Sequence, residues 1–283
     1  MTEPKLSNPL ISGPGMADPH VLVYDDTCWL FTGYDIGHGI PDWVMPEWRI
    51  YRSDDLRHWE LSGSIDPAAC FMGAGNTGCW GGDIVERNGR FYWYFSNRNR
   101  SIGVMVSDRP EGPYRDALDS PLADSFDPTV FIDSDDTPYL IWGMHDYKIA
   151  RLKPSMTAFD EPPRTIELNR KGIFPGMDKN SLHLFNGRYY LSCSGYYAIS
   201  DSVYGPYEYA GTVGTGWQLD SPYAHGDFFE FRGQWYHVWC RYRNRQIDRV
   251  RDCLIAPLRY NPDGTMEDDL SHLPDTPEAH GLL

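Results

Sequence analysis

Several features that define other protein classes are missing from this sequence. No basic stripe offsets its 40 acidic residues, and the formal net charge is −15. Phosphate recognition needs clustered lysine and arginine, so we expect no nucleic-acid partner and no binding to an anionic membrane. The chain also lacks a run of about 20 apolar residues for a membrane span, and its first residues contain no apolar signal-peptide core.

Paired-cysteine motifs are absent as well. The six cysteines are scattered without Cys-x-x-Cys spacing, and Cys28, Cys193 and Cys240 lie inside apolar runs typical of strands. A free thiol in such a run behaves as a small hydrophobe. We therefore expect reduced, buried cysteines in a cytoplasmic protein.

A long helical hydrophobic period is also lacking; an aromatic-rich repeat occurs instead. Each of five copies starts with Asp or His, continues through an alternating apolar run, turns, and ends in a second run rich in aromatics. Asn88-Gly89 and Asn186-Gly187 occupy two of the turns, where they strongly predict two-residue hairpins. The lead residues of the copies are Asp18, Asp83, Asp127, Asp178 and His225.

Strand-rich repeats with a period of about 40–50 residues are typical of β-propellers. The longer first step is explained by insertions at 36–48 and near 73–79. A two-sheet sandwich would not predict five similar units. We therefore predict an all-β, five-bladed β-propeller with a single domain over 1–283. The expected blades are 18–62, 80–117, 126–165, 178–211 and 222–265.

The lead residues of the five repeats are the candidates for a functional site. In a propeller, the start of each inner strand points into one end of the central channel, so four carboxylates and a histidine would form a ring. Clustered carboxylates repel one another and raise one another's pKa. The structural alternative is that each Asp only caps a loop. Glycoside hydrolysis uses such a cluster, because one acid protonates the leaving oxygen while an ionised partner activates water.

At this point the sequence resembles glycoside hydrolase family 43. Three segments carry the resemblance: Asn8-Pro9-Leu10 with Ala17-Asp18-Pro19-His20, Trp80-Gly81-Gly82-Asp83, and Phe126-Asp127-Pro128. The resemblance extends from Asn8 to Gly264. It implies that Asp18 is the general base and that Asp127 orients the general acid and tunes its pKa.

The fourth repeat departs from the family pattern. Nine residues before Gly187, where the family has a glutamate as general acid, this sequence has Asp178 followed by Lys179. Three interpretations stay open: Asp178 is the acid in a reshaped pocket, another carboxylate such as Glu47 or Asp42 supplies the proton, or catalysis is lost or altered.

The resemblance also bears on cations in the channel. It implies that His225 helps hold a structural calcium ion on the propeller axis through water, although calcium prefers oxygen ligands. The alternative is that His225 bonds the neighbouring aspartates. No cofactor is otherwise expected. Arg251 falls where the family places an arginine that reaches the active site, with Arg241, Arg243, Arg245 and Arg249 nearby.

Further substrate contacts are expected from aromatic and polar residues near the inner strands. The insertion 36–48 is too aromatic for a solvated loop, so Trp43 and Trp48 are candidates for the pocket mouth, although one of them could instead pack beneath the loop. The full set of predicted substrate-binding residues is His20, Tyr34, Asp35, Trp43, Trp48, Trp80, Asp83, Trp142 and Arg251.

These observations together predict an inverting, exo-acting O-glycosyl hydrolase. The resemblance implies release of a terminal sugar from small oligosaccharides, an α-L-arabinofuranoside or β-xyloside first, then a galactoside or, because of the arginine cluster, a uronide. Asp18, Asp127 and Asp178 are the predicted catalytic residues. The alternative is a non-catalytic or chemically altered sugar-binding propeller, which the aspartate at position 178 would explain.

Overall fold

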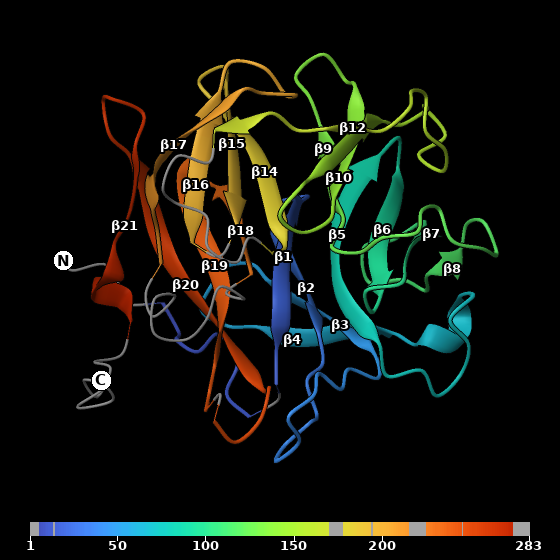
Figure 1. The fold of residues 1–283 in the computed structure, drawn as a ribbon. Helices are drawn as coiled ribbons and strands as arrows, with labels where there is room; N and C mark the ends of the chain where they lie inside the picture. The colour runs from blue at the N-terminus through green and yellow to red at the C-terminus, as the bar shows by residue number, and fades with distance from the viewer. Residues whose placement is uncertain are drawn as a thin grey trace.

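The computed structural model is a five-bladed β-propeller whose blades surround a central axis (Figure 1). It describes residues 6–13, 15–169, 178–193, 195–214, 225–244 and 246–273. Each blade is an antiparallel sheet whose first strand lies nearest the axis, except that a parallel edge strand joins blade 4. The five-bladed propeller predicted from the repeat is therefore confirmed.

The blades follow one another in chain order, and within blade 4 the first strand, β13, pairs with the last, β17. Blade 1 contains β1 (Ala17–Tyr24), β2 (Thr27–Gly33), β3 (Trp48–Ser53) and β4 (Glu60–Ile65). Blade 2 contains β5 (Cys79–Arg87), β6 (Arg90–Asn97), β7 (Ser101–Ser107) and β8 (Arg115–Asp116). Blade 3 contains β9 (Thr129–Ile132), β10 (Pro138–Trp142), β11 (Lys148–Arg151) and β12 (Arg164–Thr165). Blade 4 contains β13 (Leu168–Asn169), β14 (Asn180–Phe185), β15 (Arg188–Cys193), β16 (Tyr196–Ser200) and β17 (Tyr207–Thr212). Blade 5 contains β18 (Gly226–Phe231), β19 (Gln234–Tyr242), β20 (Arg251–Tyr260) and β21 (Met266–Asp268).

Tight turns fix the register of the inner hairpins. Asn88 and Gly89 have φ values of 52° and 73°, and Asn186 and Gly187 have 50° and 75°. Positive φ at both central residues is the geometry of a type I′ turn, which matches the twist of the flanking strands. The two predicted Asn-Gly hairpins are confirmed, at β5–β6 and β14–β15.

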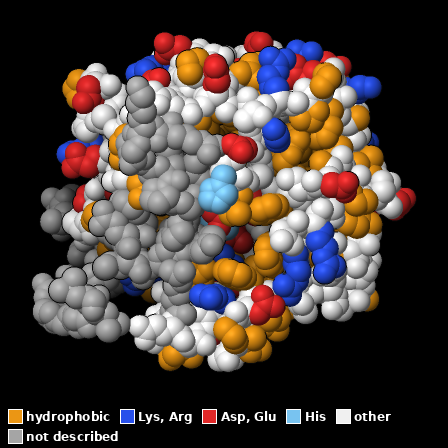
Figure 2. All heavy atoms as spheres, viewed as in Figure 1, with side chains coloured by type: hydrophobic (Ala, Val, Ile, Leu, Met, Phe, Trp, Pro, Cys, Tyr) orange, Lys and Arg blue, Asp and Glu red, His pale blue; other side chains and the backbone are white. Residues whose placement is uncertain are grey.

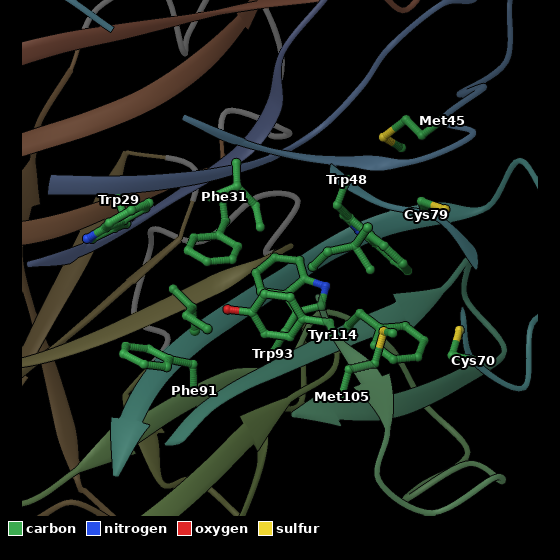
Figure 3. Close-up of a cluster of buried hydrophobic side chains, with 14 of the residues drawn as sticks. Trp29, Phe31, Met45, Trp48, Cys70, Cys79, Phe91, Trp93, Met105 and Tyr114 are labelled. Atoms are coloured by element: carbon green, nitrogen blue, oxygen red, sulfur yellow. The ribbon is translucent and has the colours of Figure 1, made fainter. Parts of the chain in front are cut away.

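Aromatic side chains fill the space between blades. Between blades 1 and 2, Phe31 stacks on Trp93 with 5.2 Å between ring centroids, and Trp48 packs edge-on against Trp93 at 6.0 Å (Figure 3). Full burial of one large apolar side chain is worth about 1.5–3 kcal/mol. The blades are therefore held together by layers of rings, which fix the inner strands relative to the axis.

The chain closes the propeller by joining its N-terminal segment to blade 5. The amides of Leu10 and Met16 donate to the carbonyls of Cys253 and Arg251, at 2.9 and 2.8 Å. The Asn8 side chain bonds both the N–H and the C=O of Ile255. These bonds occupy the half of β20 that the short β21 does not cover, so blades 1 and 5 cannot separate without breaking them.

Two further observations concern the sequence predictions. All six cysteines are free and buried, as expected. In the described ranges the helical elements are the three-residue 3₁₀ turns η1 (Pro67–Ala69) and η2 (Leu270–His272), neither of which has the length or hydropathy of a membrane span.

Candidate active site

The inner strands of all five blades bring one residue each to the same end of the axis. β1 supplies Asp18, β5 supplies Gly81, and the segments leading into β9, β14 and β18 supply Asp127, Asp178 and His225. The four side chains are no more than 6% exposed. Three of the four predicted carboxylates therefore converge on one pocket with the predicted histidine.

The backbone at the first and third positions is unusual. Asp18 and Asp127 both precede a proline and have φ values of 52° and 55°. Left-handed backbone is uncommon for any residue other than glycine, and such conformations gather at functional sites, where the surrounding structure holds them. The Ala17–His20 stretch of β1 also breaks the strand register. The local bend places the Asp18 carboxylate in the pocket.

His225 lies between two of the carboxylates. Its Nδ1 is in close contact with Oδ1 of Asp18, and its Nε2 lies 3.3 Å from Oδ2 of Asp178. This arrangement agrees with the alternative, stated from the sequence, that His225 pairs with neighbouring aspartates. One imidazole thus links the groups predicted as general base and general acid.

Arg251 contacts the same oxygen of Asp18 as His225 does. Its Nη1 lies 2.9 Å from Asp18 Oδ1, while its Nε lies 2.9 Å from Oδ2 of Asp35. Its Nη2 bonds the second Asp35 oxygen at 3.2 Å. Asp35 is 2% exposed and lies behind the arginine. It was predicted to contact substrate, but the structure makes it the support that orients Arg251.

Electrostatics separate the carboxylates into two kinds. Burial alone would raise the pKa of Asp18, but Arg251, His225 and Lys179 together hold it well below its usual value. Burial and the neighbouring Asp178 carboxylate raise the pKa of Asp127 well above its usual value. Pairs of carboxyl groups whose environments drive their pKa values apart are typical of acid–base sites. The site therefore combines one carboxyl group whose pKa is lowered, Asp18, with one whose pKa is raised, Asp127.

His225 has a strongly shifted pKa as well. Burial lowers it, but the carboxylates of Asp18 and Asp178 outweigh burial and raise the pKa well above its usual value. A protonated imidazole donates from both nitrogens, which matches its two acidic neighbours.

The pocket above these groups is small. Its volume is about 180 Å³, below the roughly 300–1,000 Å³ of pockets that enclose drug-sized ligands. Its walls are formed by Trp43, Met45, Trp80, Asn99, Phe126 and Met144. In the space-filling view, hydrophobic and charged side chains surround a hollow near the middle (Figure 2). A flat apolar wall above a carboxylate floor suits a single sugar ring.

Gly81 is required by the crowding of this floor. A Cβ atom at this position would lie 3.0 Å from Oδ1 of Asp127 and 3.6 Å from the Asp18 Cβ. Any larger residue would push the Asp127 carboxylate aside. The family-like Trp80-Gly81 segment thus contributes space as well as a wall.

Two predicted site residues lie one layer deeper. Asp83, expected in the ring of lead residues, is two residues further along β5 than Gly81 and lies 3.1 Å from Nδ1 of His20. His20 is fully buried beneath the pocket. Asp83 also accepts a bond from the Val130 amide of blade 3. Both predictions of substrate contact are corrected: these residues join inner strands below the site.

Three aromatic residues that were predicted to contact substrate lie outside the pocket lining. Trp48 is fully buried in the core between blades 1 and 2, where its indole N–H donates to the Trp80 carbonyl at 2.8 Å (Figure 3). Trp142 packs in the core, stacked on Phe159. Tyr34 lies against the Arg49 guanidinium, 3.3 Å from its ring centroid, and is not part of the pocket wall.

The other insertion tryptophan does line the pocket. The amide of Ile36 donates to the carbonyl of Val44, which folds the insertion back on itself. Trp43 then meets Trp80 edge-to-face at 5.8 Å and donates to the Tyr242 hydroxyl at 3.1 Å. Residue 45 bridges to Gly78, so the two insertions predicted from the long first repeat contact each other. Together they build one side of the mouth.

The substitute acids considered from the sequence lie outside the pocket lining. Glu47 pairs with Arg49 at 2.7 Å, and Asp42 pairs with Arg98 at 3.4 Å. Of the neighbouring arginines, Arg243 pairs with Asp252. Arg245 and the Gly176-Met177 part of the fourth-blade motif lie outside the described residues.

Other wall residues were not predicted. Met45 comes from the folded insertion 36–48, whereas Asn99 lies in the loop between β6 and β7 and Met144 in the loop between β10 and β11. Phe126 was visible beside Asp127 in the third-repeat motif, and its position before a lead residue was the signal that could have identified it.

The floor also meets one geometric requirement of a metal site. One ligand atom from each of Asp127, Asp178 and His225 lies within 4.8 Å of the others. These are the same groups that form the acid–base cluster, and His225 already faces two carboxylates.

Comparisons with known proteins agree with this site. The sequence pattern of glycosyl hydrolases family 43 matches residues 6–266. The chain is 28% identical to a xylosidase/arabinosidase of Bacteroides ovatus, over 90% of this chain and 95% of the relative. It is 27% identical to an arabinoxylan arabinofuranohydrolase of Paenibacillus polymyxa, over 83% of this chain and 46% of that protein.

Solved structures show the same architecture. A GH43_1 enzyme from Xanthomonas citri, complexed with xylose, superimposes with a TM-score of 0.80 at 26% identity, covering 93% of this chain and 92% of that one. RS223-β-xylosidase has a TM-score of 0.78 at 27% identity, covering 94% and 98%. The family match covers well over half of the chain, so this protein belongs to glycosyl hydrolase family 43 and is an O-glycosyl hydrolase.

Proposed function

We propose that the enzyme is an inverting, exo-acting glycosidase that removes a terminal β-xyloside or α-L-arabinofuranoside from short oligosaccharides. The observation that carries this proposal is the convergence of Asp18, Asp127 and Asp178 on one small pocket walled by two tryptophans. Relatives named xylosidase/arabinosidase, and a neighbour complexed with xylose, support the choice of a pentose.

Asp18 is the general base of this proposal. Arg251 and His225 hold the pKa of its carboxyl low, so it is ionised in the working range. It accepts a proton from a water molecule as the water oxygen attacks the anomeric carbon. The glycosidic bond breaks on the opposite face of the ring, and inversion follows from this single displacement.

Asp178 supplies the proton to the leaving oxygen. Burial and Asp178 raise the pKa of Asp127, and Asp127 orients its partner. An aspartate reaches one methylene less far than the usual glutamate, so the leaving oxygen must sit deeper in the pocket.

The walls determine the mode of action. The insertion that presents Trp43 closes one side of the mouth, and the pocket has room for one ring. We expect a terminal sugar to enter and internal units of a polymer to be excluded. The cytoplasmic location and the lack of nucleic-acid or membrane partners stay predictions from the sequence.

The acid assignment is tested by varying the leaving group. Asp178→Asn should lower kcat/KM on xylobiose by about 10²–10⁴-fold, because general acid catalysis contributes that much. A dinitrophenyl xyloside needs little protonation, so its turnover should fall far less. Asp18→Asn should impair both substrates, and Asp160→Asn, which changes an exposed ion pair with Arg151, should impair neither.

Three results would contradict the proposal. Equal losses on both substrates in Asp178→Asn would remove Asp178 as the acid. Product sugar with the same anomeric configuration as the substrate, followed by NMR, would exclude inversion. Binding of xylo-oligosaccharides with no release by the wild type would favour the altered-chemistry alternative.

A further inference from the structure

Beneath the pocket lies a second polar ring around the axis. Its members are His20, Asp83, Thr129, Asn180 and Asp227, each two residues after the pocket residue of its blade. Residues two apart on a strand point to the same side, so this ring repeats the pocket ring one layer down. His20 lies 3.1 Å from Asp83 and 3.6 Å from Asp227. Asp227 accepts bonds from the Val21 amide and from the Ser181 hydroxyl.

Lys179 sends its ammonium into this ring. The side chain is 1% exposed. Its stem passes the glycine of blade 2, since a Cβ at Gly81 would lie 3.5 Å from the Lys179 Cδ. The Nζ donates to the Thr129 hydroxyl and to the Asn180 carbonyl, both at 2.7 Å. The Thr129 hydroxyl itself donates to the Asn180 carbonyl at 2.6 Å, so its oxygen is free to accept from the lysine.

The carboxylates around the axis favour such a cation. Asp18, Asp127 and Asp178 form the pocket floor, and Asp83 and Asp227 lie below it. Burial lowers the pKa of Lys179, while the carboxylates of Asp83, Asp127 and Asp227 oppose this shift and favour the charged lysine. Arg251 is committed to Asp18 and Asp35 at the pocket rim. Removal of water from a group of carboxylates is tolerated only where a buried cation compensates them.

The axial calcium that the family resemblance implies does not fit these residues well. A calcium ion held through water on His225 would compete for ring nitrogens that already lie close to the Asp18 and Asp178 carboxylates. Calcium takes six to eight oxygen ligands, and a second cation on the axis would lie near the ammonium. We propose that the Lys179 ammonium is the fixed cation of the propeller axis, so that this enzyme keeps its fold and site geometry without a divalent metal.

The inference is tested on the purified enzyme without substrate, so its outcome is independent of the proposed reaction. Metal content after dialysis against metal-free buffer should show no calcium, and the melting temperature should not respond to EDTA or to added calcium. Lys179→Met removes the charge and its two hydrogen bonds while keeping most of the volume, and it should lower the melting temperature by about 6–10 °C. Lys148→Met is the matched control, because Lys148 also donates to a threonine hydroxyl, but near the surface.

A second variant separates a cationic role from simple packing. Lys179→Ala opens space beside Gly81, so millimolar calcium or magnesium should raise its melting temperature by several degrees. If neither ion raises the melting temperature of Lys179→Ala, Lys179 acts only by packing, and the inference is overturned. Stoichiometric calcium in the wild type, or a Lys179→Met melting temperature equal to that of Lys148→Met, would overturn it as well.

Discussion

Replacement of Arg251 by methionine tests how the site keeps its base ionised. The guanidinium is 2% exposed and bonds two buried carboxylates, Asp18 at 2.9 Å and Asp35 at 2.9 and 3.2 Å. Methionine preserves most of the volume but leaves both carboxylates without their main cation. Loss of one partner of a buried ion pair costs about 3–5 kcal/mol. For a chain of this size that corresponds to a fall of roughly 6–10 °C in melting temperature.

The same change should move the pH dependence in one direction. Arg251 lowers the pKa of Asp18, whose ordinary value is 3.8. A general base is inactive when protonated, so activity is lost as pH falls through its pKa. Without the arginine this pKa rises, and the acidic limb of the kcat/KM profile should shift to higher pH. Arg251→Lys keeps the charge but loses the two-pronged contact with Asp35, and should give an intermediate shift.

The assay is a pH series of kcat/KM on an aryl xyloside, combined with thermal denaturation of the same samples. Arg259→Met is the control, because Arg259 lies on the same strand in an exposed pair with Glu267 and such pairs are worth about 0–1 kcal/mol. If Arg251→Met melts within 1 °C of the control and keeps the wild-type acidic limb, the electrostatic reasoning about Asp18 is wrong.

Three further predictions concern separate parts of the molecule. Trp43→Ala should raise KM about tenfold with little change in melting temperature, whereas Trp48→Ala should destabilise the fold by about 3–5 kcal/mol, as seen by denaturant titration. Gly81→Ala should lower kcat/KM about 100-fold by displacing the Asp127 carboxylate, with far less effect on stability; wild-type activity would refute the crowding argument. Ion pairing with His20 outweighs burial and holds the pKa of Asp227 at about 2, below its ordinary 3.8, so it contributes about 2 kcal/mol above pH 3.8 that is lost as pH falls toward 2. Acid titration of Asp227→Asn should therefore show a smaller loss of stability over that window.

The repeat made the fold readable from the chain. Hairpin turns such as Asn88-Gly89 can be predicted from two residues, because those residues themselves favour positive φ. Alternating apolar runs indicate which face of a strand is buried. Five copies in order then imply five blades. Asp18, Asp127 and Asp178 could be assigned to one pocket because equivalent repeat positions occupy equivalent places around an axis.

The sequence pattern did not show how deep in the channel each lead residue lies. Asp83 begins its repeat as clearly as Asp18 begins the first, yet it lies one layer lower, because it is equivalent to His20 and the pocket position of its blade is Gly81, two residues earlier. A glycine, Gly81, occupies the pocket position of blade 2, and a residue without a side chain cannot be recognised as part of a site from a sequence motif.

The sequence by itself determined the number of blades, the three converging carboxylates and the family. Only the tertiary structure decided which insertion tryptophan lines the pocket, which groups support Asp18, and where the lysine beside Asp178 places its ammonium. The physical reason is that repeat patterns encode contacts within a blade, whereas Trp43, Arg251 and Lys179 act on residues of other blades, and those distances exist only after the ring has closed.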